Sequence, residues 1–238
     1  MSEGAEARRE HLVEVYNEAS VCEKCPLSAT RTKVVFGAGN ADADLMFVGE
    51  APGAEEDRQG LPFVGRAGAF LSELIEGIGL RREDTFVANV LKCRPPGNRD
   101  PQPVEIESCR PYLEQQVELI KPRVICTLGN FASKLLTGNP TGITKVRGNP
   151  QLHELGGHTV FVLPLLHPAA GLRTPAVAEQ LREDFSTLPD LLAQPLPQAD
   201  PLGGAEADRT EEADGEAAGL VNAVPEADQL GLFGEARG

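Results

Sequence analysis

Four of the five cysteines in this chain of 238 residues have the spacing of a metal-binding thiol set. The set is a C-x2-C pair followed by two distant thiols: Cys22, Cys25, Cys93 and Cys109. Such a pattern suits four-thiolate ligation of zinc or of an iron–sulfur cluster, and the spacing does not discriminate between them. The fifth cysteine, Cys126, lies within an apolar run and is predicted to be a core thiol.

A second group of chemically interesting residues follows the apolar runs that are typical of strands. The first run leads into the Gly/Pro loop 49–53, the second holds Asn89, and the third ends at Gly129. The fourth run ends at His167. In open α/β sheets, ligands lie beyond the carboxyl ends of the strands, where glycine lets backbone N–H groups approach them closely. Since Asn is depleted in strands and needs partners when buried, the pattern predicts a site for a small, planar, polar ligand.

Hydrophobic periodicity predicts the elements that position these residues. Short apolar runs predict strands at 45–48, 85–91, 123–128 and 159–166. Amphipathic patterns predict helices that end near Cys22 and at Gly79, and further helices around 106–120, 131–136 and 177–188. In the third of these helices, Pro111 marks either a kink or the true start. Alternating strands and helices imply βαβ units, so the predicted fold class is α/β, with three α/β/α layers and a central, mainly parallel four-stranded sheet.

Charge is distributed unevenly along the chain, whose formal net charge is −14. Residues 195–238 hold ten acidic and two basic residues, so this stretch carries −8 and the remainder −6. The bulk charge argues against a nucleic-acid partner, but local potential decides docking, and a basic face can exist on a mildly acidic domain. No apolar run approaches the roughly 18–20 residues that span a bilayer. A cytoplasmic protein is therefore expected. We also expect a monomer.

The composition divides the chain into three parts. Residues 1–194 carry the alternating strands and helices and are expected to form one domain. Pro, Gly, Ala, Asp and Glu dominate residues 195–228 without a hydrophobic period, which predicts a disordered acidic linker. Residues 229–238 follow as a C-terminal peptide.

Five motifs along residues 10–193 carry a resemblance to a known family. They are GEAPGAEED at 49–57, LPFVGRAG at 61–68, NVLKCRPP at 89–96, KVRG at 145–148 and HPAA at 167–170. In this order they closely resemble the family 4 uracil-DNA glycosylases. The resemblance implies an enzyme that flips uracil out of single- or double-stranded DNA and hydrolyses its N-glycosidic bond. The product would be an abasic site, which initiates base excision repair.

The resemblance implies a role for three residues in recognising the base. Phe63 resembles the aromatic residue that stacks on the flipped uracil. Asn89 resembles the residue that hydrogen-bonds uracil O4 and N3–H, a pairing that rejects cytosine because cytosine inverts the donor and acceptor pattern. Glu56 resembles the carboxylate beside C5, where it excludes the methyl group of thymine. A core Phe and a solvated loop carboxylate are the alternative readings of Phe63 and Glu56.

The same resemblance implies His167, Glu50 and Asn89 as catalytic residues. His167 would stabilise the negative charge that develops on uracil O2, helped by backbone amides of the loop Gly49–Ala51. Many glycosylases of this fold carry Asp or Asn just before the proline of that loop, to orient the attacking water. This chain has Ala51 there, as family 4 does. The residue that positions the water is therefore left open.

The resemblance also extends to a cofactor and to the DNA backbone. It implies a 4Fe–4S cluster held by Cys22, Cys25, Cys93 and Cys109, with a structural role near the DNA. Basic residues within or beside the motifs are expected to meet phosphates, although solvated surface charge is the alternative for each. These residues are Arg66, Lys145, Arg147 and Arg173.

The C-terminal peptide contains the sequence QLGLF at 229–233. It resembles the Q-L-x-L-F peptide by which bacterial replication and repair proteins dock on the DNA polymerase sliding clamp. Exposed apolar side chains in an acidic tail are costly unless they fill a hydrophobic pocket of a partner. The expected clamp contacts are Gln229, Leu230, Leu232 and Phe233. A tail that packs on its own domain, or a chance match, is the alternative.

Two other functions compete with a specific uracil glycosylase. The first is a glycosylase of broader scope, which also removes hypoxanthine, xanthine or other deaminated bases. The second is a non-catalytic iron–sulfur DNA-binding module that kept the fold. The intact motifs around Asn89 and His167 weigh against a loss of activity.

Overall fold

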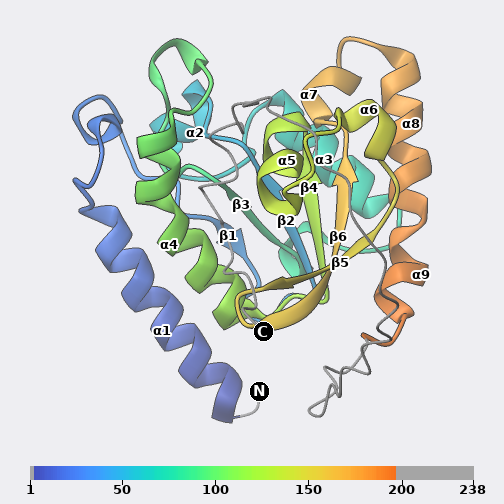
Figure 1. Ribbon diagram of the computed structural model, residues 1–238, viewed down its shortest axis with the longest axis horizontal. Helices are drawn as coiled ribbons and strands as arrows, with labels where there is room; N and C mark the ends of the chain where they lie inside the picture. The colour runs from blue at the N-terminus through green and yellow to red at the C-terminus, as the bar shows by residue number, and fades with distance from the viewer. Residues whose placement is uncertain (1–2, 197–238) are drawn as a thin grey trace, which may run out of the picture.

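The computed structural model describes residues 3–196 and places helices on both faces of one sheet (Figure 1). The strands are β1 (Ala38–Gly39), β2 (Leu45–Gly49), β3 (Phe86–Asn89), β4 (Val124–Leu128), β5 (Gln151–Leu155) and β6 (His158–Leu165). The α-helices are α1 (Glu3–Ser20), α2 (Ala54–Gln59), α3 (Arg66–Glu76), α4 (Pro103–Ile120), α5 (Asn130–Thr137), α6 (Ile143–Val146), α7 (Pro168–Gly171), α8 (Pro175–Ser186) and α9 (Leu188–Ala193). The short 3-10 helices are η1 (Pro26–Ala29), η2 (Arg82–Asp84) and η3 (Pro96–Asn98).

The sheet has six strands in the order β1-β3-β2-β4-β6-β5, not the four that the sequence predicts. The predicted strands are its parallel centre, β3-β2-β4-β6. The two additional strands are antiparallel edges. β1 has two residues, too few to give a pattern, and β5 has mostly polar, partly exposed side chains. β5 forms a hairpin with β6 through Gly156 and Gly157, both at positive φ, as such a turn requires.

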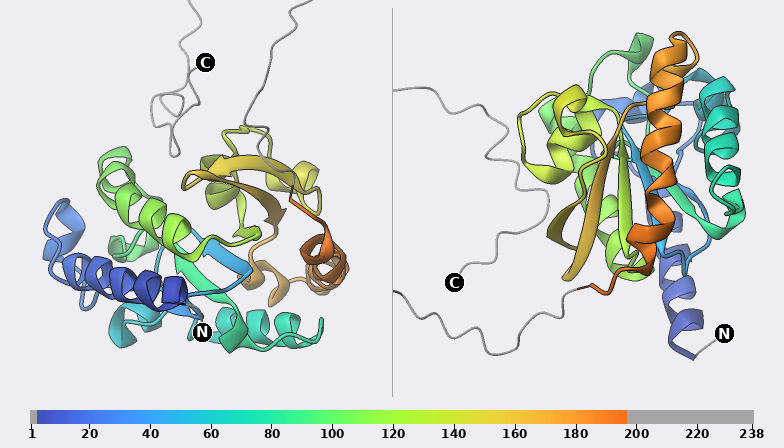
Figure 2. Two further views of the ribbon diagram at one scale, coloured as in Figure 1. Left: turned by 90° about the horizontal axis from the view of Figure 1, so that it is seen from below. Right: turned by 90° about the vertical axis from the view of Figure 1, so that its right-hand side faces the viewer.

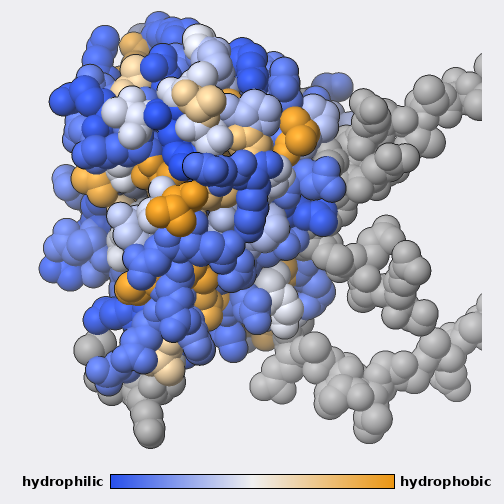
Figure 3. Space-filling view, turned by 90° about the vertical axis from the view of Figure 1, so that its left-hand side faces the viewer, coloured by the Kyte–Doolittle hydropathy of each residue, from blue (hydrophilic) through white to orange (hydrophobic). Residues whose placement is uncertain are grey.

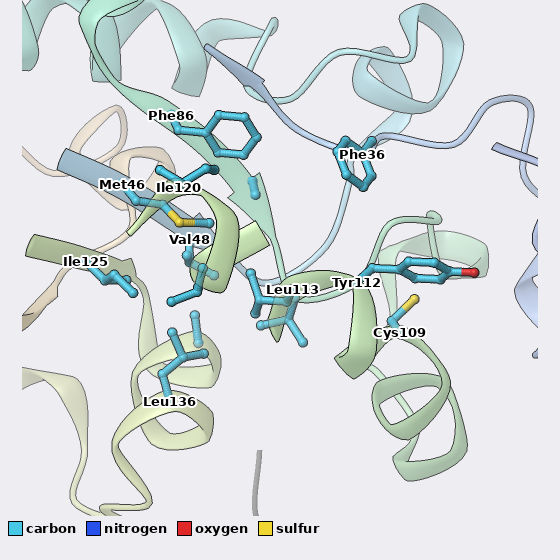
Figure 4. Close-up of a cluster of buried hydrophobic side chains, with 14 of the residues drawn as sticks. Phe36, Met46, Val48, Phe86, Cys109, Tyr112, Leu113, Ile120, Ile125 and Leu136 are labelled. Atoms are coloured by element: carbon cyan, nitrogen blue, oxygen red, sulfur yellow. The ribbon is translucent and has the colours of Figure 1, made fainter. Parts of the chain in front are cut away.

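Each face of the sheet carries its own hydrophobic core, which confirms the α/β/α layering. Figure 2 shows α1, α4 and α5 on one face and α3, α8 and α9 on the other. Successive side chains of β2 alternate between the two cores: Met46 packs with the α4 side and Phe47 with the α8 side. Figure 4 shows Met46 within the first core, close to Ile120 of α4. In the second core, the ring of Phe47 stacks on Phe185, with centroids 5.7 Å apart.

Helix α4 begins earlier than the sequence predicts. Pro103 is its first residue, and a capping box of Gln102 and Glu105 satisfies backbone groups at its start. Pro111 therefore lies inside the helix and is not its start. The early start brings Glu105 and Cys109 onto the same helix.

The outer face of α1 has few apolar side chains. The surface on this side of the molecule is mostly hydrophilic, with scattered apolar residues (Figure 3). Val13 and Tyr16 on α1 are each about half exposed, and the Tyr16 ring also packs edge-on against Phe36. No helix among residues 3–196 has the length and apolarity to cross a membrane. Nearly all of the linker predicted at 195–228, and the whole peptide at 229–238, lie outside the described residues.

Candidate active site

A pocket of about 380 Å³ lies at the carboxyl ends of the parallel strands. This is the upper edge of the sheet in Figure 1, where β2 leads into α2 and β6 into α7. The lining includes all but one of the residues predicted to meet the base: Glu50, Ala51, Glu56, Phe63, Asn89 and His167. The pocket therefore brings together residues that lie more than a hundred positions apart in the sequence.

Gly49, the remaining predicted residue, lies beneath the pocket and allows it to form. It pairs with Asn89 in the register of β2 and β3. A Cβ atom at position 49 would lie 2.3 Å from Asn89 Oδ1 and 2.9 Å from Cζ of Phe63. Since real Cβ atoms do not approach other atoms so closely, only glycine fits here.

Asn89 lines the pocket as a buried polar side chain. It is 2% exposed, and among residues 3–196 its side-chain amide has no hydrogen-bond partner. Its amide atoms are not among the fully buried side-chain atoms without a partner in the described part of the chain, so they are open to the pocket. The amide is thus free to donate to and accept from a ligand in the pocket.

Phe63 forms a wall of the pocket in a strained conformation. Its φ is 53°, which is uncommon for a bulky residue. Its carbonyl packs on Gly68, where a Cβ would lie 1.7 Å from the Phe63 oxygen. Its ring faces the imidazole of His167 at a centroid distance of 5.7 Å and an interplanar angle of 26°. The backbone strain thus places an aromatic face against the pocket.

His167 is held as a neutral donor. It is the N-cap of α7, and its Nδ1 accepts a hydrogen bond from the backbone N–H of Ala169 at 3.1 Å. Nδ1 therefore carries no proton, and in the neutral ring the proton is on Nε2. Burial lowers the pKa of His167 below its usual value, and the carboxylate of Glu56 opposes this only in part. At neutral pH, the ring thus has one N–H available for a ligand.

Glu56 is the member of the acidic run 55–57 that lines the pocket. Its Oε1 accepts from the backbone N–H groups of Val64 at 3.2 Å and Gly65 at 3.3 Å. Asp57 instead accepts from the backbone N–H of Thr32 at 2.9 Å, away from the pocket. These contacts fix the Glu56 carboxylate and argue against a solvated loop charge.

Glu50 is the ionisable group of the Gly/Pro loop in the pocket. Burial raises the pKa of its carboxyl group, and the negative charge of Asp100 adds to the effect. Asp100 belongs to the segment between Cys93 and Cys109, which also supplies Pro95, Asn98 and Arg99 to the pocket. These residues were not predicted to line the pocket. Their only signal was their position between two of the four cysteines.

The four predicted ligand thiols lie at one end of α1 and α4. Burial raises the pKa of Cys25, of Cys109 and of Cys93, the last to about 12, and each of the three is also affected by the charge of another thiol of the set. Cys109 is next to Tyr112 in Figure 4. Among residues 3–196, no group of three or more His, Cys, Asp or Glu side chains is arranged so that it could hold a metal ion.

The guanidinium group of Arg31 contacts two members of this thiol set, Cys22 and Cys93. Nη1 of Arg31 donates to the carbonyl of Cys22 at 2.6 Å and lies 3.7 Å from the sulfur of Cys93. Cys126, in contrast, is fully buried in β4 within the core on the α8 side, which confirms the prediction of a core thiol.

The four predicted phosphate contacts differ in their surroundings. Arg66, Lys145 and Arg173 are exposed. The Arg147 side chain is only 19% exposed, and its Nη1 lies 2.7 Å from the Asp184 carboxylate on α8. Arg147 is thus paired inside the protein.

Comparison with known proteins adds to this geometry. A profile of the uracil DNA glycosylase superfamily matches residues 36–188. The chain is 45% identical over 192 residues to the type-4 uracil-DNA glycosylase of Archaeoglobus fulgidus, which covers 79% of this chain and 96% of that protein. This chain belongs to the type-4 uracil-DNA glycosylase family. A second member, from Thermotoga maritima, is 50% identical over 167 residues, covering 69% of this chain and 85% of its own. A third, from Sulfurisphaera tokodaii, is 43% identical over 189 residues, covering 77% of this chain and 86% of that protein. The resemblance carried by the five motifs is thereby confirmed.

Proposed function

We propose that this protein excises uracil from DNA by hydrolysing the N-glycosyl bond, using the pocket described above. The observation that carries this proposal is the Asn89 amide, which is open to a pocket also lined by the aromatic ring of Phe63 and by a neutral His167. A pocket of about 380 Å³ admits one base, which must first leave the duplex stack. The product is an abasic site in DNA.

The base is selected by three side chains. The Asn89 amide donates to uracil O4 and accepts from N3–H, whereas cytosine offers a donor and an acceptor in the reverse order. Phe63 stacks on the base through its exposed face. Glu56, fixed by two backbone N–H groups, occupies the space that the methyl group of thymine needs.

Bond cleavage leaves negative charge on the base and positive charge on the sugar. The electron pair of the N1–C1′ bond departs with uracil, and Nε2–H of His167 donates to O2, where the charge develops. The sugar cation takes hydroxide from water, and the remaining water proton neutralises the uracil anion. Glu50 lies in the loop beside the reacting bond, where its carboxylate stabilises the sugar cation.

Three exposed basic residues are available to bind the phosphates of the DNA backbone. Lys145 lies in α6, Arg66 begins α3 and Arg173 follows α7. We assign phosphate contacts to these three. Arg147 is assigned a structural role, because Asp184 already occupies its guanidinium group.

We assign a 4Fe–4S cluster to the four-cysteine set, because four thiolates are the ligand set that such a cluster takes. The charges of Cys22, Cys25 and Cys109 act on one another, and those of Cys25 and Cys109 also act on Cys93. The Arg31 guanidinium beside Cys93 offsets part of the burial that raises the pKa of its thiol. When bound, the cluster would supply four iron–thiolate bonds that tie the N-terminal helix to α4. Iron and sulfide analysis of the purified protein, which would be brown, separates this assignment from zinc.

The first test is cleavage of a labelled oligonucleotide that carries one uracil. Thymine and hypoxanthine oligonucleotides serve as controls, and Asn89→Ala as the site variant. Alkali-labile product from uracil alone, lost in the variant, supports a specific uracil glycosylase. Product from hypoxanthine would favour the enzyme of broader scope. No product from folded, brown protein would leave the non-catalytic DNA-binding module as the better account.

A further inference from the structure

A buried lysine lies between the thiol set and the pocket. Lys92 is 1% exposed, and its Nζ donates to the main-chain oxygen of Asn89 at 2.8 Å. Nζ also donates to Oε1 of Gln116 on α4 at 2.6 Å and lies 5.8 Å from the ring centroid of Phe36. A buried amine with good partners on two sides holds one position, because leaving either partner costs hydrogen-bond energy.

The partners of Lys92 are themselves fixed. Gln116 is fully buried, and its Nε2 donates to the carbonyl of Phe36 at 2.9 Å, so its Oε1 must face Lys92. The carbonyl of Lys92 in turn accepts from the backbone N–H of Val35 at 2.7 Å. The lysine thus ties the end of β3 to α4 and to the segment before β1.

The main chain leaves the sheet at Asn89. The next two N–H groups, those of Val90 and Leu91, donate to the carbonyls of Gly49 and Glu50 at 2.9 and 3.0 Å. A side-chain donor on the Asn89 carbonyl therefore orients the peptide next to the Cα that carries the base-reading amide. Lys92 does not line the pocket, so it reaches the base only through Asn89.

We propose that Lys92 is a positioning residue that holds the Asn89 amide in register with uracil. This inference rests on the role assigned to Asn89 above. Lys92 also adjoins the thiol set, because Cys93 follows it in the sequence and because Lys92 offsets part of the burial that raises the pKa of the Cys109 thiol. The turn that carries Cys93 thus also sets the position of Asn89.

The test is a double-mutant cycle on the full-length protein with its metal content intact. Lys92→Met keeps the length and the burial but removes the donor. Because a displacement of about 1 Å can cost a hundredfold in rate, we expect single-turnover excision of uracil to slow by about tenfold to a hundredfold. In the Asn89→Ala background, the same substitution should change the rate by less than about twofold, since the amide it positions is absent.

Thr85→Val is the matched control. Thr85 is buried just before the other end of β3, and its Oγ1 donates to the carbonyl of Arg82 at 2.9 Å. Its loss should lower the melting temperature and leave the excision rate unchanged. If Lys92→Met does not fold, Gln116→Leu replaces it in the cycle, because it removes the acceptor that orients Lys92.

Two results would overturn the proposal. One is a Lys92→Met protein that excises uracil within about twofold of the wild-type rate. The other is an equal loss of rate with and without the Asn89 amide, which marks a general structural role. A fully active Asn89→Ala protein is a different failure: it removes the assigned role of Asn89 itself, whatever Lys92 does.

Discussion

At the scale of single residues, the floor of the pocket leaves no room for a side chain at position 49. Gly49→Ala would place a methyl group 2.3 Å from Asn89 Oδ1, so the Asn89 amide must move. We expect excision of uracil to fall by about a hundredfold, with a loss of about 1–3 kcal/mol in the free energy of unfolding. Single-turnover assays and denaturant titration measure the two effects.

The control for this substitution is Gly142→Ala. A Cβ at position 142 meets no atom within 4 Å, and the φ of Gly142 is −64°, which any residue adopts. This variant should excise uracil at the wild-type rate. A Gly49→Ala protein as active as this control would show that the Asn89 amide does not need its present position.

The lowered pKa of His167 gives a prediction about pH and stability. In the unfolded chain, His167 takes up a proton near its usual pKa of 6.5. In the folded protein the pKa is lower, so the ring stays unprotonated at a pH where the unfolded chain has already bound a proton. The free energy of unfolding therefore decreases as pH falls below about 6.5. Melting curves across this range should show a steeper loss for the wild type than for His167→Gln. Parallel losses would mean that His167 is not held neutral.

At the scale of secondary-structure elements, the segment of α6 with its KVRG motif is fixed to α8 by an ion pair. Arg147→Ala would leave the 5% exposed Asp184 without its partner, at a cost of about 3 kcal/mol in the free energy of unfolding. Lys145→Ala removes an exposed charge and should barely change stability. It should instead weaken DNA binding. The slope of log affinity against log salt concentration should become shallower by about the amount that one phosphate contact contributes.

Thermal melts and affinities at several salt concentrations separate these two roles. If Arg147→Ala leaves stability unchanged but flattens the salt dependence, the phosphate contact predicted from the sequence was right. The ion pair with Asp184 would then contribute little to the stability of the fold.

Elements differ in how well the sequence predicted them. The four parallel strands were predictable because they are buried on both faces and read as apolar runs. The edge strands β1 and β5 were missed because edge strands are short or polar and gain their structure from pairing. The convergence of Asn89 and His167 followed from a general rule about strand ends. The contribution of Arg99 to the pocket could not be predicted from the sequence, because Arg99 lies in a loop whose path is set by tertiary contacts.

At the scale of the whole molecule, we propose a second binding element that is separate from the pocket. The peptide 229–238 resembles a clamp-binding sequence and lies outside the described residues. Within residues 3–196, the pocket is complete without it. Catalysis and docking should therefore be separable, with the intervening acidic sequence acting as a tether that raises the concentration of the enzyme at the clamp.

Deletion of 229–238 tests this separation. The truncated protein should excise uracil from short oligonucleotides at the wild-type rate, because the pocket and the basic residues beside it remain. It should lose binding to the sliding clamp, measured by surface plasmon resonance, and so should Leu232→Ala with Phe233→Ala in the full chain. Substituting Glu235 and Arg237, which lie outside QLGLF, is the matched control. If clamp binding survives the deletion, the contact lies on the folded domain; if excision from short oligonucleotides is lost as well, the tail supports the domain and the tether is the wrong account.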